Sequence, residues 1–296
     1  KNFPIAIGIK IAARNLRRNK VFSFINIFGL ATGMACSLLI FLFVKDERSY
    51  DRFNKDAENI YRVSENLVND DGNQVPGATT PLPLALAIQK EIPEVVDVTR
   101  FFANPDWGAN FLFQNGTKKF NEQSIVLVDS SFLNVFTFPL IKGNPKTAFK
   151  EGNSVVLTES MAKKYFGNQN PVGKTLHADQ FLGDVVVTGV MKDVPRNSHF
   201  HFDFAISLQK LVGANSNDWG WNDFYTYVKV KPHTNITSFT KKIQSLYNQH
   251  DPSGKITLYA QPLTSIHLSS NLKAELEPNG DKLQIYIFSL IAIFIF

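Results

Sequence analysis

The longest apolar run in the chain lies near its start, from Val21 to Val44. Its sequence, VFSFINIFGLATGMACSLLIFLFV, contains no charged residue. A helix of about 24 residues is roughly 36 Å long, whereas the apolar core of a bilayer is about 30 Å thick. The run therefore predicts a membrane-spanning helix over residues 21–44. A cleaved signal peptide fits less well, because its apolar part is usually about 7–15 residues long.

A second apolar run, Ile285–Phe296, follows a polar block over residues 45–284. About 12 uncharged residues are too few to cross a bilayer. We interpret the chain as a fragment trimmed at both ends, and this run as the truncated start of a second membrane helix. A buried C-terminal helix is the alternative. The predicted order is thus a leading segment over 1–20, a span over 21–44, an outer domain over 45–284 and a second span that starts at 285.

The leading segment has the pattern of a basic amphipathic helix. Ile5, Ile9, Ala13 and Leu16 recur at helical spacing, and no acidic residue accompanies them. The basic side chains are Lys10, Arg14, Arg17, Arg18 and Lys20. Such a helix lies in the headgroup region of a membrane, and basic residues beside a span favour the cytoplasmic side. The alternative is a charged flank that only sets the topology.

Small residues repeat along one side of the predicted span. The set is Asn26, Gly29, Gly33 and Ser37. Small residues four apart let a second helix approach closely, and an amide can donate a hydrogen bond across such a contact. We expect this side to pack against another membrane helix.

The charges after the span alternate in sign. That pattern predicts a solvated helix that continues the span past Arg52 into the outer domain. Its predicted residues, which we call the stalk, are Lys45, Asp46, Glu47, Arg48, Tyr50, Asp51 and Phe53. A helix continuous across the membrane boundary would act as a lever.

The polar block alternates between strand and helix patterns, which predicts an α+β domain. Strands are expected at 60–68, 95–102, 154–157, 183–190, 224–231 and 256–260. Helices are expected after Thr80–Pro81, after Thr158 and over 236–246, the second ending at Gly167. An Asn115–Gly116 turn predicts a hairpin from residue 110. Two strand–helix–strand segments, 60–102 and 224–260, could be paired halves of one α/β unit, with about 106–184 as an insertion.

Composition excludes several classes of protein. The net charge of +5 comes largely from the first 20 residues, so no nucleic-acid footprint is present. The only cysteine, Cys36, lies inside the predicted span, so no disulfide can form within the chain. No GxxxxGK[ST], HExxH or GxSxG motif occurs. We therefore predict no catalytic residue, no cofactor, no metal site and no enzyme activity.

Two groups of polar and aromatic residues are candidate sites. His199 and His201 form an HxH pair, which is a weak metal signal, and surface or packing roles are preferred. Trp219 and Trp221 lie between Asp218 and Asp223, where a sugar or peptide groove is one interpretation and a structural aromatic loop the favoured one.

Three stretches together resemble one known family. They are RNLRRNKVFSFINIFGLATGMACSLLIFLFVKDERSYDRFNKDAENIYRV at the start, SVVLTESMAKKYFGNQNPVGKTL from Ser154, and VVVTGVMKDVPRNSHFHFDFAIS from Val185. The chain resembles the N-terminal part of MacB/FtsX-like ABC transporter permeases, in the form common in Bacteroidetes. The resemblance covers nearly the whole chain in the right order.

The resemblance implies a porter-like α/β subdomain that holds an inserted, mainly β, sabre-like subdomain. It also implies a permease subunit in the cell inner membrane, multi-pass, with its N-terminus in the cytoplasm and its main domain in the periplasm. ATP would be hydrolysed by a separate ATP-binding subunit to drive export. Implied partners are a second permease chain, as a homodimer or pair, and a periplasmic or outer-membrane protein. The alternative is a transmembrane sensor with a periplasmic ligand-binding domain.

Overall fold

The computed structural model describes residues 14, 16–103, 111–178, 182–212 and 217–295. These residues form two compact units. Unit 1 contains the chain up to Arg48 together with the segment from Asp281 onward, and unit 2 contains Ser49–Gly280. Most of the predicted leading helix, including Lys10, lies outside the described residues.

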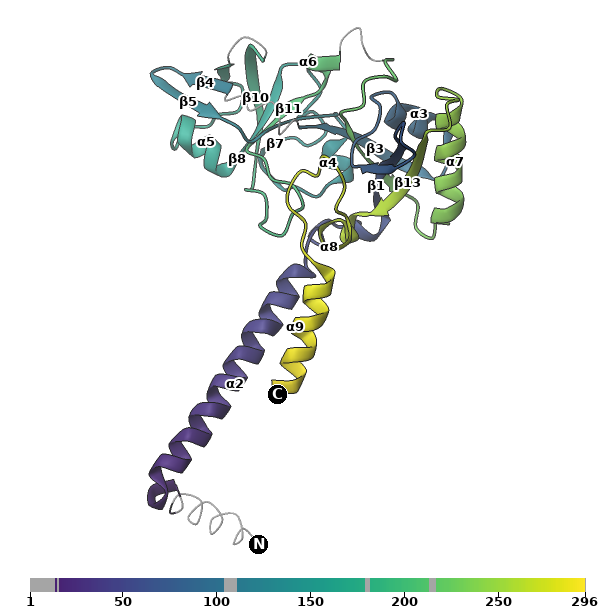
Figure 1. Ribbon diagram of the computed structural model, residues 1–296. Helices are drawn as coiled ribbons and strands as arrows, with labels where there is room; N and C mark the ends of the chain where they lie inside the picture. Colours follow the sequence, from purple (N-terminus) through teal and green to yellow (C-terminus); the bar gives the residue numbers. More distant parts are fainter. Residues whose placement is uncertain (1–13, 15, 104–110, 179–181, 213–216, 296) are drawn as a thin grey trace. The chain divides into compact units, whose positions relative to one another are not determined.

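Unit 1 is a pair of helices, α2 (Lys20–Glu47) and α9 (Lys282–Ile295), which lie side by side (Figure 1). Within the described part of the chain, α2 is the one helix long and apolar enough to cross a membrane. Its contacts with α9 run in opposite directions along the two chains, so the helices are antiparallel. The Ser37 hydroxyl donates to the Ala292 carbonyl at 3.3 Å, and the rings of Phe43 and Phe288 are 5.7 Å apart.

The helix α9 has 14 residues, so it is roughly 21 Å long and shorter than a bilayer core. Its apolar sequence fits the predicted start of a second span, which stays a prediction.

The predicted stalk helix is wrong. The helix α2 ends at Glu47, and residues 48–53 form turns. Asp51 has a φ of 60°, a left-handed conformation that an aspartate tolerates better than most residues. Its backbone N–H donates to the carbonyl of Asn197 at 2.8 Å. A long-range hydrogen bond thus takes the place of the next helical turn. Residues 45–53 contain no glycine or proline that would indicate this helix end in the sequence.

Unit 2 is built on one mixed sheet. The strands are β1 (Ile60–Val68), β2 (Gln74–Gly77), β3 (Val95–Phe102), β4 (Phe111–Asn115), β5 (Lys118–Glu122), β6 (Ile125–Val128), β7 (Leu140–Gly143), β8 (Ser154–Thr158), β9 (Thr175–Ala178), β10 (Asp184–Met191), β11 (Phe204–Ser207), β12 (Tyr225–Val230) and β13 (Ile256–Pro262). In the described residues their order is β13-β1-β12-β3-β6-β11-β8-β10-β9-β4-β5, with β2 beside β1 and β7 beside β10. The predicted α+β fold class is confirmed.

The helices of unit 2 are short. They are η1 (Ala57–Asn59), α3 (Leu84–Glu91), α4 (Phe132–Val135), α5 (Glu159–Phe166), α6 (Gln209–Val212), α7 (Ile236–Asn248), η4 (Leu263–Ser265) and α8 (Ile266–Ser269).

The two predicted strand–helix–strand segments do lie together. The segments β1-α3-β3 and β12-α7-β13 interleave, which gives the strand order β13-β1-β12-β3. Buried residues of α3 and α7, such as Ile88 and Ile243, share one core cluster with Val63 of β1. This arrangement is a split β-α-β unit. The chain between β3 and β12 adds strands β4 to β11, and β2 lies between β1 and α3 in the sequence. The strand β11, beyond the predicted 106–184, pairs with β6 and β8 of that region. The 106–184 boundary stays a prediction.

Of the two helix starts predicted from capping residues, one is confirmed and one is wrong. The hydroxyl of Thr158 accepts a hydrogen bond from the Met161 N–H at the start of α5, and Gly167 ends that helix at a φ of 60°, as expected. The expected helix start at Thr80–Pro81 is wrong, because α3 begins at Leu84. Thr80 is buried, and its hydroxyl donates to the carbonyl of Phe224, which holds it beside β12 instead.

Candidate functional site

Two segments of unit 2 continue directly into the helices of unit 1. We call Ser49–Asn59, which follows α2, linker 1, and Leu263–Gly280, which precedes α9, linker 2. These two linkers are the covalent connections between the helices of unit 1 and the sheet of unit 2. Their polar contacts with the sheet are therefore the candidate functional site.

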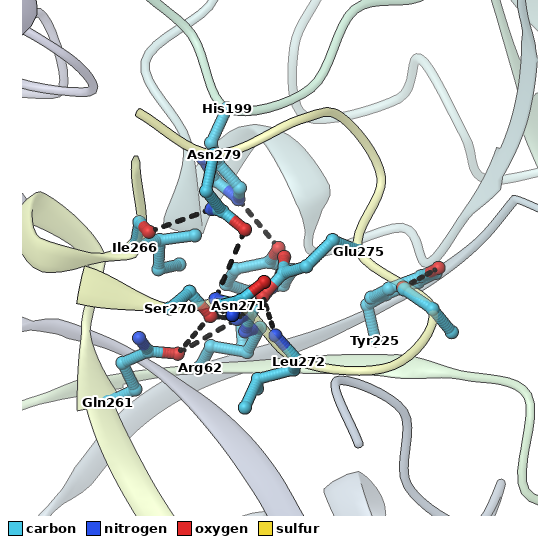
Figure 2. Close-up of polar contacts among 12 residues, drawn as sticks. Arg62, His199, Tyr225, Gln261, Ile266, Ser270, Asn271, Leu272, Glu275 and Asn279 are labelled. Carbon is cyan, nitrogen blue, oxygen red and sulfur yellow. Dashed lines mark hydrogen bonds and ion pairs between the residues drawn. The ribbon is translucent and has the colours of Figure 1, made fainter. Parts of the chain in front are cut away.

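Linker 2 is bonded to the sheet through Arg62 of β1 (Figure 2). Arg62 has no exposed surface, and its guanidinium pairs with both oxygens of Glu275, each at 2.8 Å. It also donates to Gln261 at 2.8 Å and to Ser270 at 2.7 Å. Such a bidentate pair fixes orientation as well as distance.

The register of the sheet places Arg62 between its neighbours. Gln261 of β13 lies opposite Arg62 on one side, and Tyr227 of β12 on the other. Burial opposes the charged forms of Arg62 and Glu275, but their hydrogen-bonded attraction outweighs it. The pKa of Arg62 is raised and the pKa of Glu275 is lowered as a result. The pair is therefore ionic at neutral pH.

Linker 1 is bonded to the sheet through Asp51. This carboxylate is 1% exposed and lies 2.8 Å from Nδ1 of His199, whose Nε2 lies 2.7 Å from the hydroxyl of Tyr227. The chain of Asp51, His199 and Tyr227 ends on the strand that neighbours β1. Burial raises the pKa of the Tyr227 hydroxyl above its usual range. Tyr227 has no exposed surface, so a substrate in solution cannot reach its hydroxyl. We therefore interpret the contacts of Asp51, His199 and Tyr227 as structural.

A single loop contacts both linkers. We call Pro195–His201 the clamp loop. The Asn197 amide donates to the carbonyl and the hydroxyl of Ser49 in linker 1, both at 3.0 Å. The His201 Nδ1 lies 2.5 Å from a carboxylate oxygen of Glu277 in linker 2, and its Nε2 donates to the Pro195 carbonyl at 2.9 Å.

Both ring nitrogens of His201 thus face acceptors, which favours the protonated ring. The hydrogen bond to Glu277 is the main reason that the pKa of His201 is raised, and partial burial opposes it. The clamp loop is therefore ionically bonded to linker 2 at mildly acidic pH. It is bonded to linker 1 through the Asn197 amide and through the contact of His199 with the Asp51 carboxylate.

The linkers also contact each other directly. The ring of Tyr50 stacks on His267 with 3.3 Å between the ring centres and 2° between the planes. The η1 and η4 turns are in contact as well. The two linkers therefore form one bonded assembly with the clamp loop.

The residues of the predicted stalk are divided between the two units. Lys45, Asp46 and Glu47 form the last turn of α2, and Arg48 caps it. In unit 2, Tyr50 and Asp51 make the contacts described above, and Phe53 packs on Phe138. The stalk is thus a helix end followed by an anchored turn.

The predicted small-residue stripe is divided as well. Ser37 and Gly33 face α9, where a Cβ at Gly33 would lie 3.3 Å from Ile295. A Cβ at Gly29 would meet nothing within 4 Å, and Asn26 is exposed. The basic residues Arg14, Arg17, Arg18 and Lys20 are exposed on the first helical turns. Their role at a membrane stays a prediction.

The other candidates are accounted for by packing. His199 and His201 each have protein partners on both ring nitrogens, and the described residues include no group of three or more His, Cys, Asp or Glu that could hold a metal. Trp219 stacks on His250, and Trp221 packs on Phe224 while its ring nitrogen donates to Asp223.

Sequence reasoning missed Arg62, Glu275 and Asn197. Arg62 stands in the apolar strand pattern IYRVS, and an arginine between apolar strand residues is a usable sign of a buried ion pair. Nothing local identifies its partner, which is 213 positions away.

Comparison with known proteins agrees with this fold. Residues 23–246 match the family described as the MacB-like periplasmic core domain. A domain assigned to a permease of Porphyromonas gingivalis is similar in structure, with a TM-score of 0.61 and 22% identity, over 71% of this chain and 91% of that one. A search of curated proteins gives no match.

Two further structures are similar. The periplasmic region of MacB from Actinobacillus actinomycetemcomitans has a TM-score of 0.50 and 17% identity, over 71% of this chain and 91% of that one. The extracellular domain of the noncanonical ABC-type transporter YknZ from Gram-positive bacteria has a TM-score of 0.51 and 17% identity, over 69% of this chain and all (100%) of that one. Identities this low establish the fold alone. The family match spans more than half of the chain, and the chain therefore belongs to the MacB-like periplasmic core domain family of ABC transporter permeases.

Proposed function

We propose that this chain is a permease subunit whose periplasmic unit changes conformation when a separate cytoplasmic subunit binds and hydrolyses ATP. Family membership supports the transporter class. The absence of a GxxxxGK[ST] motif from the sequence is in keeping with an ATPase on another chain. The movement would serve export, and in this proposal the permease works as a mechanical transmitter.

The observation that carries this proposal is the common anchoring of the two linkers. Linker 1 is bonded to the clamp loop through Ser49, and linker 2 through Glu277. Linker 1 also reaches β12 indirectly, because His199 contacts both Asp51 and Tyr227. Linker 2 is bonded to the neighbouring strand β1 through the pair of Glu275 with Arg62. Movement of either helix would therefore displace the same part of the sheet.

The bonds involved are suited to transmit force. The Arg62–Glu275 pair and the Asp51–His199 contact are nearly excluded from water. Hydrogen bonds in such surroundings are electrostatically stronger than those in water, and breaking one leaves an unpaired buried group. In this proposal the anchored turn replaces the continuous lever helix that the charge pattern had predicted.

The topology and the partners belong to the proposal too. The basic residues before α2 favour a cytoplasmic N-terminus, which would place unit 2 in the periplasm. The apolar α9 would then be the start of a return span in a multi-pass inner-membrane protein. A second permease chain, as a homodimer or pair, and a periplasmic or outer-membrane protein are the proposed partners, since the family resemblance implies both.

Hydrogen exchange tests the proposed coupling. The full-length permease and its ATP-binding subunit would be reconstituted in nanodiscs, with and without a non-hydrolysable ATP analogue. We expect nucleotide to change exchange rates in both linkers and the clamp loop. The double variant Asn197→Ala/His201→Ala should bind the ATPase subunit normally and lose that change. The matched control is Arg196→Ala, an exposed position in the same loop.

Two results would refute the coupling. One is that nucleotide leaves the hydrogen-exchange rates of the wild-type linkers unchanged. The other is an identical nucleotide response in the wild type and in the Asn197→Ala/His201→Ala variant. A periplasmic small molecule that altered linker exchange without any ATPase subunit would instead favour a sensor.

A further inference from the structure

Glu65 is a buried acid outside the linker contacts. It lies on β1 with 7% of its surface exposed. Leu258 of β13 and Gly77 of β2 lie opposite it in the sheet, and a Cβ at Gly77 would lie only 3.3 Å from the Glu65 Cγ. Since side chains alternate along a strand, Glu65 shares a face with Val63 and lies on the opposite face from Arg62. The cation nearest in sequence is thus turned away from it.

The carboxyl group of Glu65 contacts Asn222, in the loop before β12. The Asn222 amide nitrogen Nδ2 donates to Glu65 Oε1 at 2.8 Å. Among the described residues, the other carboxyl oxygen, Oε2, is buried and has no hydrogen-bond partner, and the same holds for the Asn222 oxygen Oδ1. A buried carboxylate oxygen without a donor is costly, and one acceptor cannot satisfy another.

One proton would satisfy both atoms. We propose that Glu65 is held as the neutral acid, with Oε2–H donating to Asn222 Oδ1 while Asn222 Nδ2 donates to Oε1. The resulting cyclic acid–amide pair fastens the loop Trp219–Asp223 to β1. When the proton leaves to solvent, the pair opens and the loop is released.

The surrounding groups favour the neutral acid. Burial raises the pKa of Glu65, and the Asn222 amide offsets only part of that effect. The neighbouring titratable groups are Tyr247 of α7 and Tyr259 of β13. Burial is the main reason that the pKa of each tyrosine is raised, so both are uncharged at neutral pH. Neither of them offers Glu65 a counter-ion.

The loop itself brings more negative charge. Asp223 in the loop accepts from the ring nitrogen of Trp221, and Asp218, directly before the loop, accepts from the Gly220 N–H. Just after α7, His250 stacks on Trp219, and Asp251 accepts from the hydroxyl of Tyr247 in that helix. Trp219 of the fastened loop therefore packs against the end of α7. Release of the loop would change the surroundings of this side chain, so tryptophan fluorescence reports the release.

Infrared spectroscopy of the full chain in detergent tests the proton directly. At pH 5.5 an ordinary glutamate with a pKa of about 4.3 is only about 6% protonated. We expect a protonated-carboxyl band in the wild type at this pH that is missing in Glu65→Gln. Comparison with this variant removes the contribution of Asp203, whose pKa burial also raises. No difference between the two spectra would overturn the proposal.

Thermal unfolding gives an independent readout. The native state would bind one more proton than the unfolded state above about pH 4.3, so wild-type stability should fall as pH rises through the folded pKa. Glu65→Gln can make the same two hydrogen bonds without a proton, so its melting temperature should lack that fall. Parallel pH profiles in the two proteins would contradict the proposal.

A third measurement covers the case in which Glu65→Gln does not fold. In the wild type alone, the protonated-carboxyl band and the tryptophan emission should change with one common midpoint above pH 4.5. Tryptophan emission that stays constant from pH 4.5 to 8 would overturn the proposal. So would a loop that added calcium keeps fastened to β1 at pH 7 when the protonated-carboxyl band is missing.

Discussion

The buried Arg62–Glu275 pair predicts a large difference between single and double substitutions. Glu275→Leu would leave the Arg62 guanidinium, which has no exposed surface, with only the neutral acceptors Gln261 and Ser270. Two unit charges about 4 Å apart attract by about 4 kcal/mol at an effective dielectric constant of about 20. Removing one partner of a buried pair typically costs about 3–5 kcal/mol. We expect Glu275→Leu to destabilise unit 2 by that amount.

The double variant Arg62→Met/Glu275→Leu removes both charges and fills the space with apolar atoms. Such replacements are often neutral or stabilising. For a domain of this size, about 1 kcal/mol corresponds to roughly 2–4 °C. The single variant should therefore melt roughly 6–20 °C below the wild type, and the double variant close to it. Calorimetry of the chain in detergent measures both, and Glu58→Gln, at the exposed Arg52–Glu58 pair, is the control.

The sign of the pH dependence gives a second check. The pKa of Glu275 is lowered in the folded state, so its stabilising contribution is present above about pH 4.3, the unfolded value, and is lost as pH falls through the folded pKa. The difference between wild type and single variant should shrink in that acidic window. If Glu275→Leu melted within 2 °C of the double variant at pH 7, the claim of a functional ionic anchor would fail.

Three further predictions concern the linkers and the helix pair. The pKa of His201 should exceed 6.5 by NMR titration and return toward 6.5 in Glu277→Gln, so their contact is strongest below about pH 6.5 and weakens as pH rises through the raised pKa; an unshifted wild-type value would contradict the contact. Asn197→Ala should speed hydrogen exchange in linker 1 about five-fold, for a loss of about 1 kcal/mol, and an unchanged rate would argue against the clamp. In a Cys36→Ala background, cysteines at 37 and 292 should crosslink in unit 1; Gly33→Leu should block this through the Ile295 contact and Gly29→Leu should not.

Short-range patterns carried much of the fold. Strands expected at 60–68 and 95–102 match β1 and β3, because apolar residues such as Val63 and Phe101 alternate or cluster as a buried sheet requires. The start and end of α5 followed from Thr158 and Gly167, whose cap geometry is set by neighbours within four residues. The family was recognisable from three motifs, one of which contains the clamp loop.

The contacts that define the candidate site were not predictable in the same way. Asp51 meets a histidine 148 positions away, and its long-range bonds end α2 where the charge pattern predicted continuation. Thr80 has the local appearance of a helix cap but is held in a buried bridge to β12. Short strands such as β2 and β7 have weak patterns of their own and form because longer strands pair with them. Pairing over such separations depends on the tertiary fold rather than on local periodicity.

The central claim is that the linkers and the clamp loop carry motion from the membrane helices into unit 2. Spin labels at positions 18 and 90, in a Cys36→Ala chain assembled with its ATPase subunit, measure this most directly by pulsed electron resonance. We expect a non-hydrolysable ATP analogue to shift the distance distribution in this chain. The double variant Asn197→Ala/His201→Ala should abolish that shift while the ATPase subunit stays bound. The same shift in both proteins, or none in either, would contradict it.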